Sequence, residues 1–117
     1  MVAIETKGSR PVLTVNVGKD FTRFPSGRLM KHGNTSGEAL RVKFLQPPLS
    51  SGQSVIVELD GTIGYNSSFL EEAFGGLVRE LKVTTDYVLK LLTLKSDDSA
   101  LLEEIVQYMK DAEKQIH

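Results

Sequence analysis

A short apolar strand followed by an amphipathic helix is encoded in one continuous stretch, residues 54–81, which reads SVIVELDGTIGYNSSFLEEAFGGLVREL. Its run Val55-Ile56-Val57 is β-branched throughout and is typical of a largely buried strand at the centre of a sheet. From Phe69 to Leu81 the apolar side chains recur every three or four residues, which predicts a helix with one buried face. A strand and a helix in this order indicate an α/β layer fold.

Upstream of this stretch, the sequence predicts a strand and then a long loop. Residues 12–17 form a β-branched-rich run between Pro11 and Gly18, which favours a strand. Residues 2–6 are a candidate to pair with it as a hairpin. Residues 19–34 contain proline, glycine and scattered charges without clean periodicity, so we expect a long ordered loop. Loops of this length tend to be functional.

A first helix is predicted between this loop and the central strand. Thr35 and Glu38 have the spacing of a capping box, in which each side chain satisfies an amide at the start of a helix. The helix should run from about residue 36 to 45. Pro47 and Pro48 should end it, because proline donates no backbone hydrogen bond and disfavours helical geometry in the residue before it.

Downstream, the sequence predicts one more strand and one more helix. Residues 87–94 form a short apolar run, which suits a strand. Asp97 or Asp98 can cap a last helix. The apolar stripe of that helix consists of Leu101, Leu102, Ile105, Val106, Met109, Ala112 and Ile116. The complete pattern predicts an α/β fold with a mixed sheet of about four strands and three helices.

The composition bounds the class of protein. A chain of 117 residues suits one domain, which we assign to residues 12–117, with residues 1–11 as an N-terminal extension or edge strand. The formal net charge of −1 gives no general attraction to nucleic acid or to anionic lipid. The absence of cysteine and the presence of only two histidines argue against a disulfide framework, a metal site or a cofactor bound through such ligands. We expect a cytoplasmic protein without a signal peptide or membrane span.

The turn after the central strand is the candidate binding site. Gly64, Tyr65 and Asn66 lead into Ser67 and Ser68, two hydroxyls at a helix start. Ligands of α/β proteins favour the carboxyl edge of the sheet, and unpaired amides at a helix start favour a negative group. A phosphate could therefore be bound here or carried by a modified serine. In the alternative interpretation, Ser68 and Glu71 simply form a capping box that stabilises the helix by ~1 kcal/mol.

The segment Asn66-Ser67-Ser68-Phe69-Leu70 resembles the Asp-Ser-Ser-Gly-Leu region of STAS domains, known from anti-sigma-factor antagonists. In that family a partner kinase phosphorylates the first serine, and the modification switches partner binding. The resemblance implies this role for Ser67, with Ser68 beside it. Asn66 stands where STAS domains usually have Asp, and Phe69 where they have Gly.

A more specific resemblance is to the STAS-like domain family of unassigned function. It is carried by Phe24-Pro25-Ser26-Gly27-Arg28, by Ser36-Gly37-Glu38 and by the run from Ser68 to Leu77, SFLEEAFGGL. The resemblance implies a STAS-like fold. It also implies a protein partner, which would be an ATP-binding, kinase-like regulator.

Two further features permit both a structural and a functional interpretation. Gly75 and Gly76 inside a helix cost about 2 kcal/mol relative to alanine, which close packing on the sheet or a docking groove for a partner would explain. Arg28 belongs to a loop with an excess of positive charge, and it either pairs with a phosphate or partner carboxylate or is simply solvated. The pairs Glu71-Glu72 and Glu103-Glu104 are interpreted as mostly solvent-facing charge.

These features favour a non-catalytic regulatory domain that binds another protein and is controlled by serine phosphorylation. The alternative is a small module that binds an anion or nucleotide at the same turn. A hydrolase using Ser67 and His32 ranks third, because the sequence has no Gly-x-Ser-x-Gly elbow. A homo-oligomer and a monomer fit the composition equally well. The candidate partner- or anion-binding residues are Arg28, Gly64, Tyr65, Asn66, Ser67, Phe69, Glu72, Gly75 and Gly76.

Overall fold

The sheet of the computed structural model, which describes residues 11–116, is built from three parallel strands. They are β1 (Leu13–Asn16), β2 (Val55–Glu58) and β3 (Leu92–Lys95), in the order β1-β2-β3. The strand from residue 55 is central, as predicted. The mixed sheet of about four strands is wrong for the described residues, because each strand is joined to the next by a helical crossover, which makes neighbours parallel. The suggested hairpin strand at residues 2–6 lies outside the described residues.

The first helical segment is longer than predicted. It consists of α1 (Gly37–Leu40), a π-helical turn η3 (Arg41–Leu45) and α2 (Gln46–Ser50), which follow one another without a break. The prolines at positions 47 and 48 do not end it. They occupy the first turn of α2, where a missing N–H is tolerated.

The predicted capping box at this helix is also wrong. Ser36 is the N-cap, and its Oγ accepts a hydrogen bond from the amide of Ala39. The Glu38 carboxylate accepts from the amide of Met30 at 2.8 Å and so holds the preceding loop. That loop, predicted over residues 19–34, is largely irregular and includes two short turns, η1 (Val17–Phe21) and η2 (Met30–His32).

The second helical segment confirms the prediction from apolar periodicity. It consists of α3 (Ser67–Leu70), a π-helical turn η4 (Glu71–Gly75) and α4 (Gly76–Leu81), and it ends at Lys82, which adopts a left-handed conformation.

After this segment, the structure corrects the predicted strand at residues 87–94. Most of that run is helix α5 (Thr85–Leu91), capped by the hydroxyl of Thr84, and only its end belongs to β3. The last helix, α6 (Ser99–Ile116), is confirmed, and Asp98 caps it by accepting from the amide of Leu101. The described residues therefore contain more helices than the three predicted.

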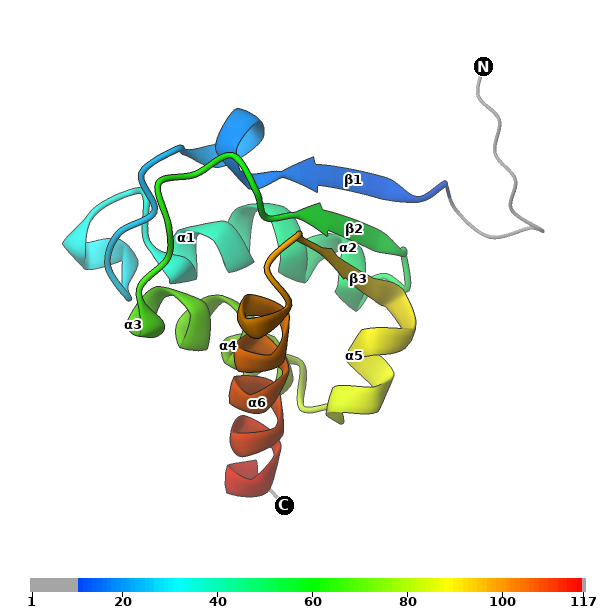
Figure 1. Cartoon of the computed structure of the whole chain (residues 1–117). Coiled ribbons are helices and arrows are strands. Elements are labelled where there is room, and N and C mark those ends of the chain that lie inside the picture. The colour runs from blue at the N-terminus through cyan, green and yellow to red at the C-terminus, as the bar shows by residue number, and fades with distance from the viewer. Residues whose placement is uncertain (1–10, 117) are drawn as a thin grey trace.

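The molecule has two layers. Figure 1 shows α1 to α4 and α6 gathered on one side of the sheet, with α5 at the end where β3 begins. Inward-facing strand residues such as Val15 and Val57 are buried, whereas Thr14 and Thr93 on the opposite face are exposed. The segment from α3 to α4 is the central helix, because it contacts α1 and η3 on one flank and α6 on the other. This position buries nearly all of its apolar face.

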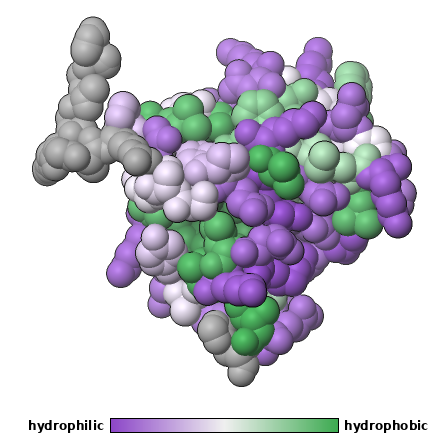
Figure 2. All heavy atoms as spheres, turned by 180° about the vertical axis from the view of Figure 1, so that it is seen from behind, coloured by the Kyte–Doolittle hydropathy of each residue, from purple (hydrophilic) through white to green (hydrophobic). Residues whose placement is uncertain are grey.

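The back of the molecule is mainly polar. Figure 2 shows this side, where hydrophilic residues dominate and apolar ones form separate areas. Among the helices that the structure describes, none combines the length and apolarity needed to cross a bilayer.

Candidate functional site

The turn between β2 and α3 is held by internal hydrogen bonds. Gly64 has φ of 128°, a conformation that favours glycine. The Tyr65 hydroxyl donates to the carbonyl of Leu59 at 2.7 Å. Burial, aided by the charge of Asp60, raises the pKa of Tyr65 to about 12, although the Thr62 hydroxyl acts in the opposite direction. Tyr65 therefore anchors the turn and stays protonated.

Asn66, and not Ser68, caps the helix. Its side-chain oxygen accepts from the amide of Phe69 at 2.9 Å and from the hydroxyl of Ser68 at 3.0 Å. The capping box suggested for Ser68 and Glu71 is therefore wrong. Asparagine and aspartate are both good caps, so Asn66 can serve as a cap at the position where the resemblance to STAS domains implies an aspartate.

Ser67 is the exposed hydroxyl of the pair. It is the first residue of α3 and lies beside α6. There the Tyr108 hydroxyl donates to the Glu104 carboxylate at 2.6 Å, which raises the pKa of Tyr108. The Ser67 hydroxyl is close enough to lower that pKa, and the charge of Glu71 raises it. Ser67 is thus accessible and has Tyr108, whose hydroxyl is bonded to Glu104, as a polar neighbour.

One turn after Ser67, two glutamates and three arginines form a set that we call the arginine–glutamate cluster: Arg28, Arg41, Arg79, Glu71 and Glu72. Arg28 Nη1 donates to Glu71 Oε1 at 2.6 Å and to Glu72 Oε1 at 3.2 Å. Arg41 donates to Glu72 Oε2 at 2.9 Å and to the Glu72 carbonyl at 3.1 Å. Arg79 donates to both carboxylate oxygens of Glu71.

The cluster corrects the interpretation of Glu71 and Glu72 as solvent-facing charge, since the Glu72 side chain is only 13% exposed. Burial on its own would raise the pKa of Glu71, but hydrogen bonds from Arg79 and Arg28 outweigh it and lower that pKa. Glu71 is therefore a carboxylate at neutral pH.

Sequence reasoning missed Arg41 and Arg79. The signal that could have indicated a buried Arg41 was its position in the first predicted helix, one turn before the apolar Leu45, which is buried. Arg41 and Glu71 each begin a π-helical turn, a feature that is frequent at functional sites.

Three of the sequence-predicted partner residues are buried. Phe69 packs against Phe21 and Tyr65 in the core. A Cβ on Gly75 would lie 3.2 Å from the carbonyl oxygen of Tyr108, and one on Gly76 would lie 2.5 Å from Nε of Arg41. The glycine pair therefore serves close packing against α6 and against Arg41. It lines no open groove.

Some of the predicted residues thus lie together at the surface, whereas others are buried. Gly64, Asn66 and Ser67 are exposed, and Arg28 and Glu72 lie in the adjoining cluster. His32 is exposed in the loop at residues 30–32.

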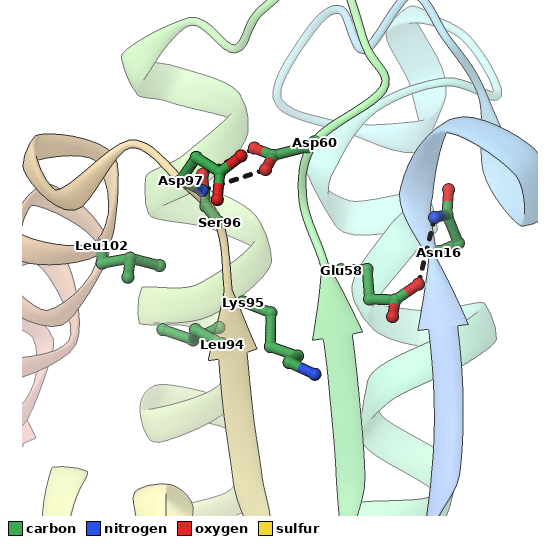
Figure 3. A pocket seen from close by; sticks show the side chains of 8 residues that line it. All are labelled: Asn16, Glu58, Asp60, Leu94, Lys95, Ser96, Asp97 and Leu102. Atoms are coloured by element: carbon green, nitrogen blue, oxygen red, sulfur yellow. Dashed lines mark hydrogen bonds between the residues drawn. The ribbon is translucent and has the colours of Figure 1, made fainter.

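A separate hollow of about 490 Å³ lies at the carboxyl ends of the strands. Figure 3 shows Asn16, Glu58 and Lys95 side by side on the three strands, with the Asn16 amide donating to Glu58 at 3.1 Å. Asp60 accepts from the Ser96 hydroxyl at 2.7 Å and from the Asp97 amide at 3.0 Å, and these bonds lower its pKa. Asp60 thereby ties β2 to the loop before α6.

The sequence analysis expected ligands at this edge of the sheet, but none of its candidate binding residues lines the hollow. Over residues 11–116, no group of three or more acidic, histidine or cysteine side chains is arranged to hold a metal ion.

Comparison with known families gives a match over most of the helical and sheet region. A family model described as a STAS-like domain of unknown function matches residues 36–102, more than half of the chain. The matched span includes Arg41, Ser67 and both glutamates, whereas Arg28 precedes it. Neither the curated proteins nor the solved structures contain a match.

Proposed function

Because the chain belongs to the family of STAS-like domains of unknown function, we propose that it is a regulatory domain that binds another protein and is controlled at Ser67. By resemblance to STAS domains, the partner is an ATP-binding, kinase-like regulator that can phosphorylate this serine. The cysteine-free composition suits a cytoplasmic location for the complex.

The observation that carries this proposal is the exposed Ser67 hydroxyl on a fixed turn. We call Gly64, Asn66, Ser67 and Arg28 the Ser67 surface. Asn66 and Tyr65 hold its backbone, so a partner would meet a preformed shape and lose little entropy in ordering it. The apolar face of the central helix is buried, so docking would use this turn and its surroundings.

A non-catalytic role is supported by the state of the carboxylates. Glu71 and Glu72, the acids nearest to Ser67 on its own helix, are occupied by arginines. A general base would need to accept a proton from the serine, and a lowered pKa makes Glu71 a poor acceptor.

The test is affinity purification from the native cell with three baits: the wild type, Ser67→Glu and Ser50→Glu. Ser50 is an exposed serine at the end of α2, before the amino end of β2, and serves as the matched control. We expect one stoichiometric partner with the wild type and with Ser50→Glu, and its loss with Ser67→Glu. We also expect phosphate on Ser67 of the untagged protein by mass spectrometry. No stoichiometric partner and no phosphate on Ser67 would overturn the proposal.

A second candidate function, binding of a small anion or nucleotide, is favoured by the charge of the cluster. Three arginines face two glutamates, so one positive charge is unmatched, and Arg28 is its most exposed member. Inorganic phosphate, ATP or GTP should then raise the melting temperature of the wild type without any partner present, and that of Arg28→Gln much less. Equal melting temperatures with and without these ligands would remove this candidate.

A further inference from the structure

The two most exposed large apolar side chains of residues 11–116 lie on neighbouring loops. Ile63 is 71% exposed and Phe24 is 59% exposed. The amide of Ile63 donates to the carbonyl of Arg23 at 2.9 Å, and Phe24 is the residue that follows this carbonyl. Covalent geometry then places the Cα atoms of Ile63 and Phe24 within about 7 Å of each other. The two side chains therefore share one area of the surface, and we call them the apolar pair.

The two loops that carry the apolar pair are fixed to each other. They leave the carboxyl ends of β1 and β2, and Figure 1 shows them side by side. A Cβ on Gly18 would lie only 2.6 Å from the carbonyl oxygen of Gly61, so the two backbones are in close contact. The Thr22 hydroxyl also accepts from the amide of Phe24 at 3.0 Å. The apolar pair is therefore presented to solvent by a defined backbone.

The loop of Ile63 also borders a hollow of about 340 Å³, which we call the acidic hollow. It lies between this loop and the start of α6, and its charged residues are Asp60, Asp98 and Glu104. These carboxylates accept hydrogen bonds from hydroxyls and amides, and none of them forms an ion pair with a described residue. The hollow therefore suits a cation.

Arg23 supplies such a cation on the other side of the Ile63 loop. It is exposed, and none of the carboxylates in residues 11–116 pairs with it. The Ile63 amide points to Arg23, whereas the acidic hollow lies toward α6. One copy of the chain thus presents a cation, an apolar pair and an anionic hollow next to one another. A two-fold axis through the apolar pair brings the cation of each copy to the hollow of the other.

We propose that two copies of this chain associate through the apolar pair, with Arg23 of each copy bound in the acidic hollow of the other. The apolar pairs cover each other at the axis. Each ion pair is formed twice, as an isologous contact requires. Arginine is among the residues that contribute most to the energy of such interfaces. The inference does not depend on the proposed phosphorylation of Ser67.

A second copy is the occupant because this chain carries both halves of the complementary charge. Its formal net charge of −1 also gives little general repulsion between copies. The contact is small, so the dimer should be weak and should dissociate in the micromolar range. Gly64 lines the acidic hollow and also belongs to the Ser67 surface. Self-association would therefore cover part of the Ser67 surface and compete with a protein partner that docks there.

The experiment is sedimentation velocity of the full chain across a roughly hundredfold range of concentration that reaches the high micromolar range. We expect the wild type to shift from monomer to dimer as its concentration rises. Ile63→Ser should stay monomeric, and its fold should be unaffected because the Ile63 side chain is mostly exposed. Tyr87→Ser, at an exposed apolar position of α5 beside the opposite end of the sheet, is the matched control. It should dimerise as the wild type does.

A second arm tests the ion pair between the two copies. Arg23→Glu and Glu104→Lys each place like charges at both contacts of their own dimer, and each alone should weaken dimerisation by about tenfold or more. In an equal mixture of the two variants, one contact of the mixed dimer joins the introduced glutamate to the introduced lysine. The other contact joins Arg23 to Glu104 as in the wild type. The mixture should therefore dimerise much more strongly than either variant alone.

A wild type that is monomeric at every concentration would overturn the proposal. So would a dimer that persists in Ile63→Ser or is lost in Tyr87→Ser, because the contact would then lie elsewhere. A mixture no more associated than its two components would also overturn it. No partner protein and no phosphate takes part in these measurements. Failure here would leave the proposed function standing, and failure to find a partner would leave this result unaffected.

Discussion

Gly76 makes room for the guanidinium of Arg41, and this explains a residue that is otherwise unfavourable in a helix. The Arg41 side chain cannot easily move aside, because hydrogen bonds to Gln46 and to the carbonyl and carboxylate of Glu72 hold it. The cost of glycine in the helix is thus offset by a buried arginine that joins the first helical segment to the central helix.

We predict that Gly76→Ala lowers stability by about 1–3 kcal/mol, because the added methyl group overpacks the site. At an unconstrained helical position the same change would stabilise by about 1 kcal/mol. Urea unfolding followed by circular dichroism measures the difference. Lys110→Ala, at an exposed position of α6, is the control and should change stability little. If Gly76→Ala were as stable as the wild type, the Arg41 side chain would have to move aside from the added methyl group at no cost in stability.

At the scale of elements, the start of the central helix depends on Asn66. We predict that Asn66→Ala lowers stability by about 1 kcal/mol, since the amide of Phe69 loses its acceptor. Asn66→Asp should keep the cap and stay close to the wild type. Thermal or urea unfolding of the three proteins gives the comparison, and equal losses in both variants would contradict the capping role.

The contacts between elements also predict a dependence on pH. The folded pKa of Glu71 is lowered, while glutamate in the unfolded chain titrates near ~4.3. Stability from this carboxylate is therefore fully present above ~4.3 and is lost as the pH falls through the lower, folded value. The urea midpoint should fall between pH 7 and pH 3 by less in Glu71→Gln than in the wild type. Glu103→Gln, exposed on α6, should behave as the wild type does.

Periodic apolar patterns correctly predicted the elements with a clear buried face. The errors arose where an apolar run or a proline was consistent with more than one local structure. The central helix follows directly from its buried face. The prediction of a strand at residues 87–94 was wrong because this apolar run contains most of helix α5 and the start of strand β3. The residue that caps α5, Thr84, lies just before the run. The prediction that Pro47 and Pro48 end the first helix was wrong because α2 begins right after the π-helical turn η3. The two prolines therefore lie in the first turn of α2, where proline is tolerated.

The candidate site was predictable only where it is continuous in sequence. The exposed position of Ser67 at a helix start follows from strand, turn and helix in one stretch. The pairing of Arg28 and Arg41 with Glu72 could not be predicted, because it joins residues more than 30 positions apart. Tertiary packing, and not local sequence, turned Glu71 and Glu72 from apparent surface charge into the centre of a cluster.

At the scale of the whole molecule, the two layers make the faces of the sheet unequal. Val57 is fully buried under the helices, whereas Ile56 beside it points to the opposite face and is partly exposed. We predict that Val57→Thr costs about 1–3 kcal/mol, because it buries a hydroxyl. Ile56→Thr should cost less than half as much. Urea unfolding would detect the difference, and similar losses at both positions would mean that the second face is also buried.

The parallel order of the strands determines when the sheet can form during folding. Leu13 pairs with Val55, and Val55 pairs with Leu92, so the chain must close a long loop before either strand pair contributes. A hairpin would nucleate within a few residues, but these strands depend on contacts of high contact order, which form slowly. During synthesis, the strand at residue 13 therefore waits until residue 55 has left the ribosome, and the local helices between them form first.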